Sequence, residues 1–398
     1  MKTIEIGIFG APINNMNLGC QALTYSIVSL LEQVSKNLNI EFHYNLFDRH
    51  PDENRNIKFC EHLGVDCSKI TVWGRGNFHD VLRRIKYRDD NKKIKSIMPN
   101  CSFVIDLTEG DSFTDIYGQY RLDVLNFYKV FIERVSSLIL GSQTYGPFNN
   151  ITNEKVAADI IKKATAVFTR DKISGSYVKK ISDVDPILTC DLAFRLPYKS
   201  HADVMNRQLK KIGFNVSGLL VSGKKEDTDT VFTLETNYDA FVKKILEYLV
   251  SKSYEIHLIG HVEADYTVNK ILKEKYPSVI LAPEFDNPMD AKSYISSMDL
   301  FIGSRMHATI AALTSNTPVV PVAYSRKFTG LFENVDYPYV VDLQTEDTNE
   351  AVQAVIDRIE NYDETKRATE KSYQIAMRQN DECLKAYETV IRKVLSNR

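Results

Sequence analysis

The sequence predicts an α/β protein built from two parallel-sheet domains. Short apolar runs alternate with amphipathic stretches along the 398 residues, and this alternation is typical of β–α–β units. A chain of this length also exceeds the size at which one hydrophobic core usually divides into two. The polar segment at residues 197–211 has no clear apolar period, so we expect the domain boundary there.

The apolar runs place the expected strands and helices in order. We expect an N-terminal domain at 1–200, a C-terminal domain at 201–365, and a helix at 366–398 that buries one face and packs back toward the N-terminal domain. Ligands of open parallel sheets bind at the carboxyl ends of the strands, so we expect a cleft between two such edges. The strands are expected at 4–9, 103–107, 137–141, 164–169, 215–221, 255–259, 279–282, 300–302 and 319–321.

Composition excludes several classes of function. Lys and Arg number 50 and Asp and Glu 52, so no excess of positive charge favours nucleic-acid binding. The six cysteines show no Cys-x-x-Cys pair or zinc-like spacing, so we expect reduced thiols, no metal and a cytoplasmic protein. No apolar run approaches the ~20 residues of a membrane-spanning helix. The motifs of phosphate loops, dinucleotide sites, zinc proteases and α/β-hydrolases are absent from the sequence.

The stretch GSRMHATIAAL, residues 303–313, combines cations with the start of a helix. A buried strand is expected to end at Gly303, Ser304 is a good N-cap, and Arg305 and His307 then fall in the first helical turn. A cation at that position opposes the helix dipole unless an anion is bound, and the free backbone N–H groups favour the same anion. The structural alternative is that Arg305 pairs with a buried carboxylate and His307 is a core histidine.

Other polar side chains fall at predicted strand ends. Asparagine-rich loops either bind ligands or simply make turns. Strand-end carboxylates either orient sugar hydroxyls or accept a proton, or they have a capping or solvated role. The residues concerned are Tyr324 and Lys327 after the strand at 319–321, Arg170 and His261 after two other strands, Asn17 in an asparagine-rich loop, and Glu109 and Asp111 in the loop TEGD.

Taken together, six short sequence blocks of this chain resemble the polysaccharide pyruvyl transferase family. The most specific carriers are GSRMHATIAAL and YSRKFTG (324–330), supported by NLGCQAL (17–23), GSQTYGP (141–147), TRDKIS (169–174) and CDLAFRL (190–196). They follow the family's order over most of the chain. Two loops differ from the family pattern, since Cys20 replaces an acidic residue and TEGD replaces a glycine-rich turn. Both loops are expected to border the acceptor.

The resemblance implies two Rossmann-like domains facing a cleft, similar to GT-B glycosyltransferases. It also implies transfer of the pyruvyl group of phosphoenolpyruvate to two hydroxyls of a sugar, in a surface polysaccharide such as a capsule or exopolysaccharide, or in its lipid-linked precursor. A cyclic ketal forms and phosphate is released. Phosphoenolpyruvate is then a co-substrate, and no cofactor or metal is expected. The donor would lie on the C-terminal domain and the acceptor on the N-terminal domain.

Roles carry over by matched position. Arg305 and Lys327 would bind the donor's phosphate and carboxylate, and His307 would bind or protonate the donor. Arg170 would face the donor from the N-terminal domain, and His261 is carried over on the histidine and the later Asp265. The remaining assignments are Ser304 and Tyr324 to the donor and Asn17, Glu109 and Asp111 to the acceptor.

Two other functions stay open. A GT-B glycosyltransferase would use the same strand-to-helix corner for the diphosphate of a nucleotide sugar. A saccharide-binding or scaffold protein would keep the cations for structural reasons. The sequence also leaves open the identity of the sugar and its hydroxyl pair, contact with the inner face of the cytoplasmic membrane, and self-association.

Overall fold

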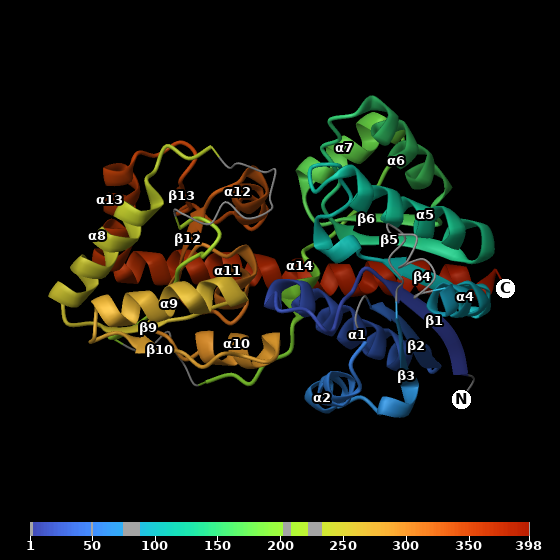
Figure 1. The fold of residues 1–398 in the computed structure, drawn as a ribbon, viewed down its shortest axis with the longest axis horizontal. Helices are drawn as coiled ribbons and strands as arrows, with labels where there is room; N and C mark the ends of the chain where they lie inside the picture. The colour runs from blue at the N-terminus through green and yellow to red at the C-terminus, as the bar shows by residue number, and fades with distance from the viewer. Residues whose placement is uncertain (1–2, 49–50, 75–87, 202–207, 222–232, 398) are drawn as a thin grey trace. The chain divides into compact units, whose positions relative to one another are not determined.

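The computed structural model describes residues 3–48, 51–74, 88–201, 208–221 and 233–397 (Figure 1). The chain forms two compact units. Unit 1 comprises Met1–Asn15, Leu23–Pro197 and Gln379–Arg398, and unit 2 comprises Met16–Ala22 and Tyr198–Arg378. Each unit holds its own parallel sheet, so the α/β class expected from the sequence is confirmed.

Unit 1 contains a seven-stranded sheet in the order β3-β2-β1-β4-β5-β6-β7. Many of its interior side chains are apolar, as in Ile6 and Ile8 on β1 and Ile105 on β4, which are fully buried. Of the strands, β2, β3 and β7 had not been expected from the sequence. The strands are β1 (Thr3–Phe9), β2 (Glu41–Asp48), β3 (Ile70–Gly74), β4 (Phe103–Asp106), β5 (Ser137–Gln143), β6 (Ala166–Thr169) and β7 (Ile187–Leu188).

Helices cover this sheet, and α5, α6 and α7 pack in a row (Figure 1). Several begin at a side chain that accepts a backbone N–H, which is the usual N-cap arrangement. Asn150 caps α6 in this way and Asp171 caps α7. The helices are α1 (Leu18–Leu38), α2 (Glu53–Leu63), α4 (Arg88–Ile97), α5 (Gln119–Val135), α6 (Ile151–Lys163) and α7 (Lys172–Ser182), the first turn of α1 belonging to unit 2.

Unit 2 contains a six-stranded sheet in the order β10-β9-β8-β11-β12-β13. The strand expected at 215–221 is wrong, because β8 is Lys211–Asn215 and ends where that run was expected to begin. The remaining strands are β9 (Glu255–Leu258), β10 (Ile280–Leu281), β11 (Leu300–Gly303), β12 (Val319–Ala323) and β13 (Val341–Asp342). The helices are α8 (Tyr238–Ser251), α9 (Glu263–Lys275), α10 (Pro288–Ile295), α11 (Met306–Leu313), α12 (Arg326–Glu333) and α13 (Thr348–Glu360).

The long C-terminal helix expected from the sequence is present as α14 (Tyr362–Ser396). Its first part belongs to unit 2, where the Tyr362 hydroxyl donates to the Asp299 carbonyl at 2.9 Å. Its last part belongs to unit 1, where the Tyr387 ring stacks on Phe168 with centroids 4.1 Å apart. One continuous helix therefore contributes to the core of both units.

Cys60 and Cys67 correct one sequence expectation. They form a disulfide, with Cα atoms 5.5 Å apart, so the expectation of six reduced thiols is wrong for this pair. Cys60 lies near the end of α2, and the left-handed Gly64 that follows (φ 64°) turns the chain so that Cys67 returns beside it.

Within the described ranges, no helix is both long and apolar enough to cross a membrane.

Candidate functional site

The cations predicted at the strand ends of unit 2 meet where β8, β9 and β11 finish. β11 ends at Gly303, as expected, but Arg305 rather than Ser304 is the N-cap of α11. Ser304 is buried and its hydroxyl accepts from the Tyr238 hydroxyl at 2.9 Å. The Arg305 backbone N–H instead donates to Asn215 Oδ1 at 2.8 Å. Because Asn215 ends the neighbouring β8, this bond fixes where α11 begins.

The Arg305 guanidinium is held along one edge by Asp265. Nη2 lies 2.8 Å from Asp265 Oδ1, and Nε lies 3.2 Å from each carboxylate oxygen. Burial alone would lower the pKa of Arg305, but the attraction of Asp265 outweighs it and the net shift is upward. The structural alternative considered for Arg305 is therefore present. The Asp265 carboxylate contacts Nε and Nη2 only, and among the described residues Nη1 has no hydrogen-bond partner.

His261 lies beside these cations and is 4% exposed. Neither ring nitrogen has a hydrogen-bond partner within the described part of the chain. Burial, and then repulsion from His307 and Arg305, lower the pKa of His261 to about 3. The imidazole is therefore neutral in neutral solution, and one of its nitrogens carries the proton while the other can accept one.

The first turn of α1 completes this part of unit 2. The Leu18 N–H donates to the His261 carbonyl at 3.1 Å. Asn17 Oδ1 accepts the Gly19 N–H at 2.9 Å, so Asn17, which the sequence assigned to the acceptor, caps α1 here. The His307 ring lies against Gly19, because a Cβ built on Gly19 would be 2.5 Å from His307 Nδ1.

Tyr324 and Lys327 follow β12, the next strand in the sheet. The Tyr324 ring packs edge-on against Phe328, with centroids 6.1 Å apart, and Tyr324 is close enough to affect the pKa of Arg305. Lys327 is half-buried in the first turn of α12. The structure thus gathers Arg305, His307 and His261 into one cluster with Tyr324 beside it.

Arg170, Glu109 and Asp111 belong to unit 1. Arg170 follows β6, its side chain is 3% exposed, and Nη1 donates to Asp191 Oδ2 at 2.8 Å. Arg170 Nη2 is buried and has no partner among the residues described. Burial would lower the pKa of Arg170, but the charges of Asp191, Asp111 and then Asp171 reverse the shift.

The loop TEGD after β4 lies beside Arg170. Thr108, Glu109 and Gly110 all have positive φ (44°, 54° and 89°), a left-handed run that bends the chain sharply. A Cβ on Gly110 would lie 3.5 Å from Arg170 Nη1. Glu109, assigned to the acceptor, accepts from Arg121 Nη2 at 2.6 Å, and Asp111 accepts from the Tyr117 hydroxyl at 2.9 Å.

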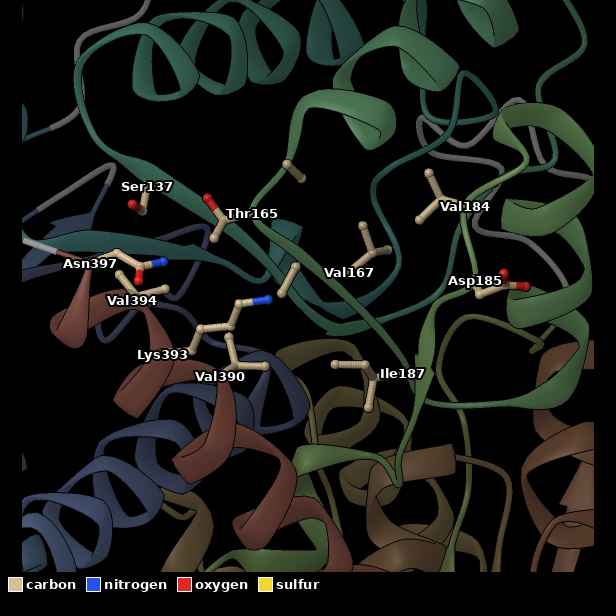
Figure 2. Close-up of a pocket in the computed structure, with 12 residues that line it drawn as sticks. Ser137, Thr165, Val167, Val184, Asp185, Ile187, Val390, Lys393, Val394 and Asn397 are labelled. Atoms are coloured by element: carbon tan, nitrogen blue, oxygen red, sulfur yellow. The ribbon is translucent and has the colours of Figure 1, made fainter.

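A cavity of about 420 Å³ lies at the other edge of the unit 1 sheet. Figure 2 shows Ser137, Thr165 and Ile187 around it, facing Lys393 and Val394 of α14. Because β5 and β7 begin at this edge, the cavity is remote from the carboxyl end of β6 that carries Arg170. The residues predicted for the site therefore do not line it.

Two residues of the cluster had no predicted role of their own. Asp265 entered the sequence argument only as a match beside His261, and Asn215 was expected at the start of a strand. Asp265 lies four positions after His261, in the first turn of α9, where an aspartate is ordinary. In the ranges that the structure covers, no group of three or more His, Cys, Asp and Glu side chains could hold a metal ion.

Comparisons with known proteins bear on the family and the fold of the chain. The description of the polysaccharide pyruvyl transferase family matches residues 17–326. No curated protein matches the sequence. Solved structures do match over the whole chain, and at these low identities they show a shared GT-B-like fold alone.

Three of these structures are informative about the fold. Anabaena Alr3699/HepE, in complex with UDP and glucose, gives a TM-score of 0.57 at 12% identity and covers 100% of this chain and 99% of its own. UDP-GlcNAc 2-epimerase from Neisseria meningitidis, bound to UDP-GlcNAc, gives 0.58 at 11%, covering 99% and 100%. Sucrose-phosphate synthase from Thermosynechococcus elongatus gives 0.59 at 10%, covering 100% of both chains.

Proposed function

The chain belongs to the polysaccharide pyruvyl transferase family, and on that premise we propose that it moves the pyruvyl group of phosphoenolpyruvate onto two hydroxyls of a saccharide. The acceptor is a sugar of a polysaccharide or of its lipid-linked precursor, and the product is a cyclic ketal. The observation that carries the proposal is the cluster of Arg305, His261 and His307 at one sheet edge of unit 2.

This cluster suits a small, densely anionic donor. Arg305 has an edge that Asp265 does not occupy, and an arginine edge matches a carboxylate or phosphate in two parallel hydrogen bonds. His261 is buried with both ring nitrogens unpartnered in the described structure, which costs free energy unless a ligand supplies the partner. The N-termini of α1 and α11 add backbone dipoles of the same sign.

We assign proton transfer to His307. The methylene carbon of phosphoenolpyruvate takes a proton, and one sugar hydroxyl attacks the adjacent carbon and loses its proton. The second hydroxyl then forms the other C–O bond and gives up its proton as the C–O bond to phosphate breaks, so that the ketal closes and phosphate leaves with that proton. A positioned acid or base typically contributes ~10²–10⁴-fold to such a rate. His261, with a pKa of about 3, is not charged at neutral pH, so we give it a hydrogen-bonding role toward the donor.

We further propose that donor binding also involves Lys327, Tyr324 and, from unit 1, Arg170. The acceptor is bordered by Glu109 and Asp111. The cations stabilise the leaving phosphate electrostatically, and we propose that the reaction needs no metal or cofactor. Phosphate release that persists in excess EDTA supports this, and loss of turnover that Mg²⁺ restores contradicts it. We place the enzyme in the cytoplasm or at the inner membrane face, which cell fractionation tests.

Calorimetric titration with phosphoenolpyruvate tests the donor. We expect saturable binding that disappears in Arg305→Ala. Arg358→Ala is the matched control, because Arg358 is also an arginine of unit 2 with 17% side-chain exposure and a carboxylate partner, Glu364, at 3.1 Å. Binding of a nucleotide sugar in preference to phosphoenolpyruvate would instead favour the glycosyltransferase function.

Turnover separates an enzyme from a binding protein. With a saccharide acceptor present, the wild type should release phosphate from phosphoenolpyruvate, whereas His307→Ala should bind the donor and release little. Full activity in His307→Ala would remove its proton-transfer role. A wild type that binds saccharides and releases no phosphate from any donor would be a saccharide-binding protein.

A further inference from the structure

The carboxylate of Asp265 is fully buried and joins three loops of unit 2. Oδ1 accepts the Gly218 N–H at 2.8 Å, from the segment after β8. Oδ2 accepts the N–H groups of His261 at 3.1 Å and Val262 at 3.3 Å, from the segment after β9. The fixed backbone of these loops therefore sets the position of the carboxylate before any ligand is present.

The same carboxylate also holds the Arg305 side chain, which comes from the segment after β11. Three guanidinium contacts of 2.8 to 3.2 Å align one edge of the fork with Asp265. Asn215 strengthens the link, since its Nδ2 donates to the Ile259 carbonyl at 2.8 Å while its Oδ1 accepts the Arg305 N–H. Since β9, β8 and β11 are neighbours in the sheet, Asp265 and Asn215 connect three adjacent strand ends.

These contacts restrict Arg305 to one orientation. An unrestrained arginine loses the freedom to rotate about several side-chain bonds when it binds an anion, and this loss of conformational entropy weakens binding. Here the backbone N–H of Arg305 is fixed by Asn215 and one edge of its guanidinium by Asp265, while Nη1 has no partner among the described residues. The side chain is 15% exposed and that of Asp265 is not exposed.

We propose that Asp265 is a positioning residue, which takes one edge of Arg305 so that the other edge is presented to an anionic ligand. The identity of that ligand as phosphoenolpyruvate rests on the proposed function, whereas the positioning role does not. Electrostatics alone predicts the opposite effect. A carboxylate beside Arg305 reduces the local positive charge and should weaken the binding of an anion.

Asp265→Asn distinguishes positioning from charge. The amide keeps the size of the side chain, but only its oxygen accepts, so it can accept backbone N–H groups on one side alone and cannot accept along the whole arginine edge. We expect phosphoenolpyruvate and inorganic phosphate to bind about 10-fold more weakly or worse, by analogy with the loss of metal affinity when the outer hydrogen-bond partner of a metal ligand is removed. Unchanged or tighter binding overturns the proposal, because the lost negative charge would then dominate.

Asp299→Asn is the matched control. Asp299 is also a buried aspartate of unit 2 and accepts two backbone N–H groups, those of Lys210 at 3.0 Å and Lys211 at 2.7 Å. It lies at the amino end of β11, opposite the cluster, and we expect wild-type anion affinity there. An equal loss of affinity in Asp299→Asn would show that any damage to the sheet weakens the site, and would overturn the specific role.

A double-mutant comparison removes the remaining structural explanation. If Asp265 acts through Arg305, Asp265→Asn should cause little further loss of inorganic phosphate affinity in an Arg305→Lys background, which retains a positive charge. Losses that multiply in the double variant would overturn the proposal. Arg305→Lys gives a second test, because it retains the charge without the fork, and its affinity should fall about as far as that of Asp265→Asn.

A readout without ligand keeps this proposal separate from the proposed function. If inorganic phosphate binds and phosphoenolpyruvate does not, the donor assignment fails while positioning is still tested on phosphate. If neither anion binds, or if Asp265→Asn does not fold, NMR of the wild type decides whether Asp265 holds the guanidinium. The measured quantity is the exchange rate of the Arg305 Nε–H proton with water. We expect this proton to exchange slowly, and exchange as fast as that of the exposed Arg326 would overturn the proposal.

Discussion

Gly19→Ala tests whether α1 sets the position of His307. Gly19 is the second residue of α1, and its Cα faces the His307 ring. An added Cβ would lie 2.5 Å from Nδ1, 2.8 Å from Cγ and 3.1 Å from Asn17 Oδ1. Contacts under 3.0 Å are not found for real Cβ atoms, so one of the two groups must move.

The size of the movement follows from these distances. Ordinary contact begins at 3.4 Å, so the ring must retreat by 3.4 − 2.5 = 0.9 Å. Gly19 is held by Asn17 and by the bond from Leu18 to the His261 carbonyl, so we expect His307 to move. Misplacing a catalytic group by about 1 Å can cost about 10²-fold in rate. Overpacking costs about 1–3 kcal/mol, partly offset by about 1 kcal/mol of helix propensity that alanine gains over glycine.

The assay measures the release of phosphate from phosphoenolpyruvate in the presence of an acceptor that supports wild-type turnover. Urea unfolding measures stability in parallel. We expect kcat to fall about 100-fold while the free energy of unfolding falls by about 2 kcal/mol or less. Gly175→Ala is the control, because it adds the same methyl in the first turn of α7, where the nearest atom is Thr169 Oγ1 at 3.4 Å. Wild-type kcat in Gly19→Ala would refute the placement of His307 against α1.

Three further predictions concern the same clusters. The pKa of His261 is about 3 in the fold against an ordinary 6.5, so its contribution to stability is complete above pH 6.5 and is lost as the pH falls toward 3. Between pH 7 and pH 5 the wild type should lose about 2 kcal/mol more than His261→Gln in urea unfolding, and equal losses would contradict the burial of a neutral imidazole. Tyr238→Phe removes the hydroxyl that joins the Ser217 N–H and the Ser304 hydroxyl. It should cost about 1–3 kcal/mol of unfolding free energy, and no measurable cost would show that water replaces the link. Arg170→Lys keeps the charge and loses the fork, so phosphoenolpyruvate should bind about 10-fold more weakly if Arg170 faces the donor. Wild-type affinity would leave Arg170 a structural residue.

The sequence predicted the strand-to-helix corner of Arg305 and His307 because the signal there is local. A buried apolar run, a glycine and a helical apolar pattern follow one another within about a dozen residues, and such punctuation is what periodicity detects best. The N-cap of α11 lies at Arg305, one residue after the predicted Ser304, and the reason is not local. Asn215, on another strand, accepts the Arg305 N–H, which leaves Ser304 to the Tyr238 hydroxyl.

The roles of Asn215 and Asp265 depend on contacts between distant segments. The apolar run after Asn215 continues through Val216 into residues 219–221, so periodicity placed the strand too late and put Asn215 at its start. In the structure Val216 is buried beyond the strand, and Asn215 lies at the carboxyl edge where ligands bind. The sequence placed Asn17 in the N-terminal domain, because the order of the chain does not reveal that Met16–Ala22 belongs to unit 2.

The two arginines of the proposed donor site share one local arrangement, and this bears on whether they are structural. Each follows a strand, and each gives part of its guanidinium to a fully buried aspartate, Arg305 to Asp265 and Arg170 to Asp191. A purely structural arginine at these depths would be expected to satisfy its whole fork, because a buried unpaired donor costs about 1–3 kcal/mol. Arg170 Nη2 is nevertheless buried without a partner in the described structure, whereas Arg305 is partly exposed and its Nη1 has no partner among the described residues. Pairing with a carboxylate therefore does not argue against ligand binding, since the pairing orients each fork while the open edge retains the capacity to bind an anion.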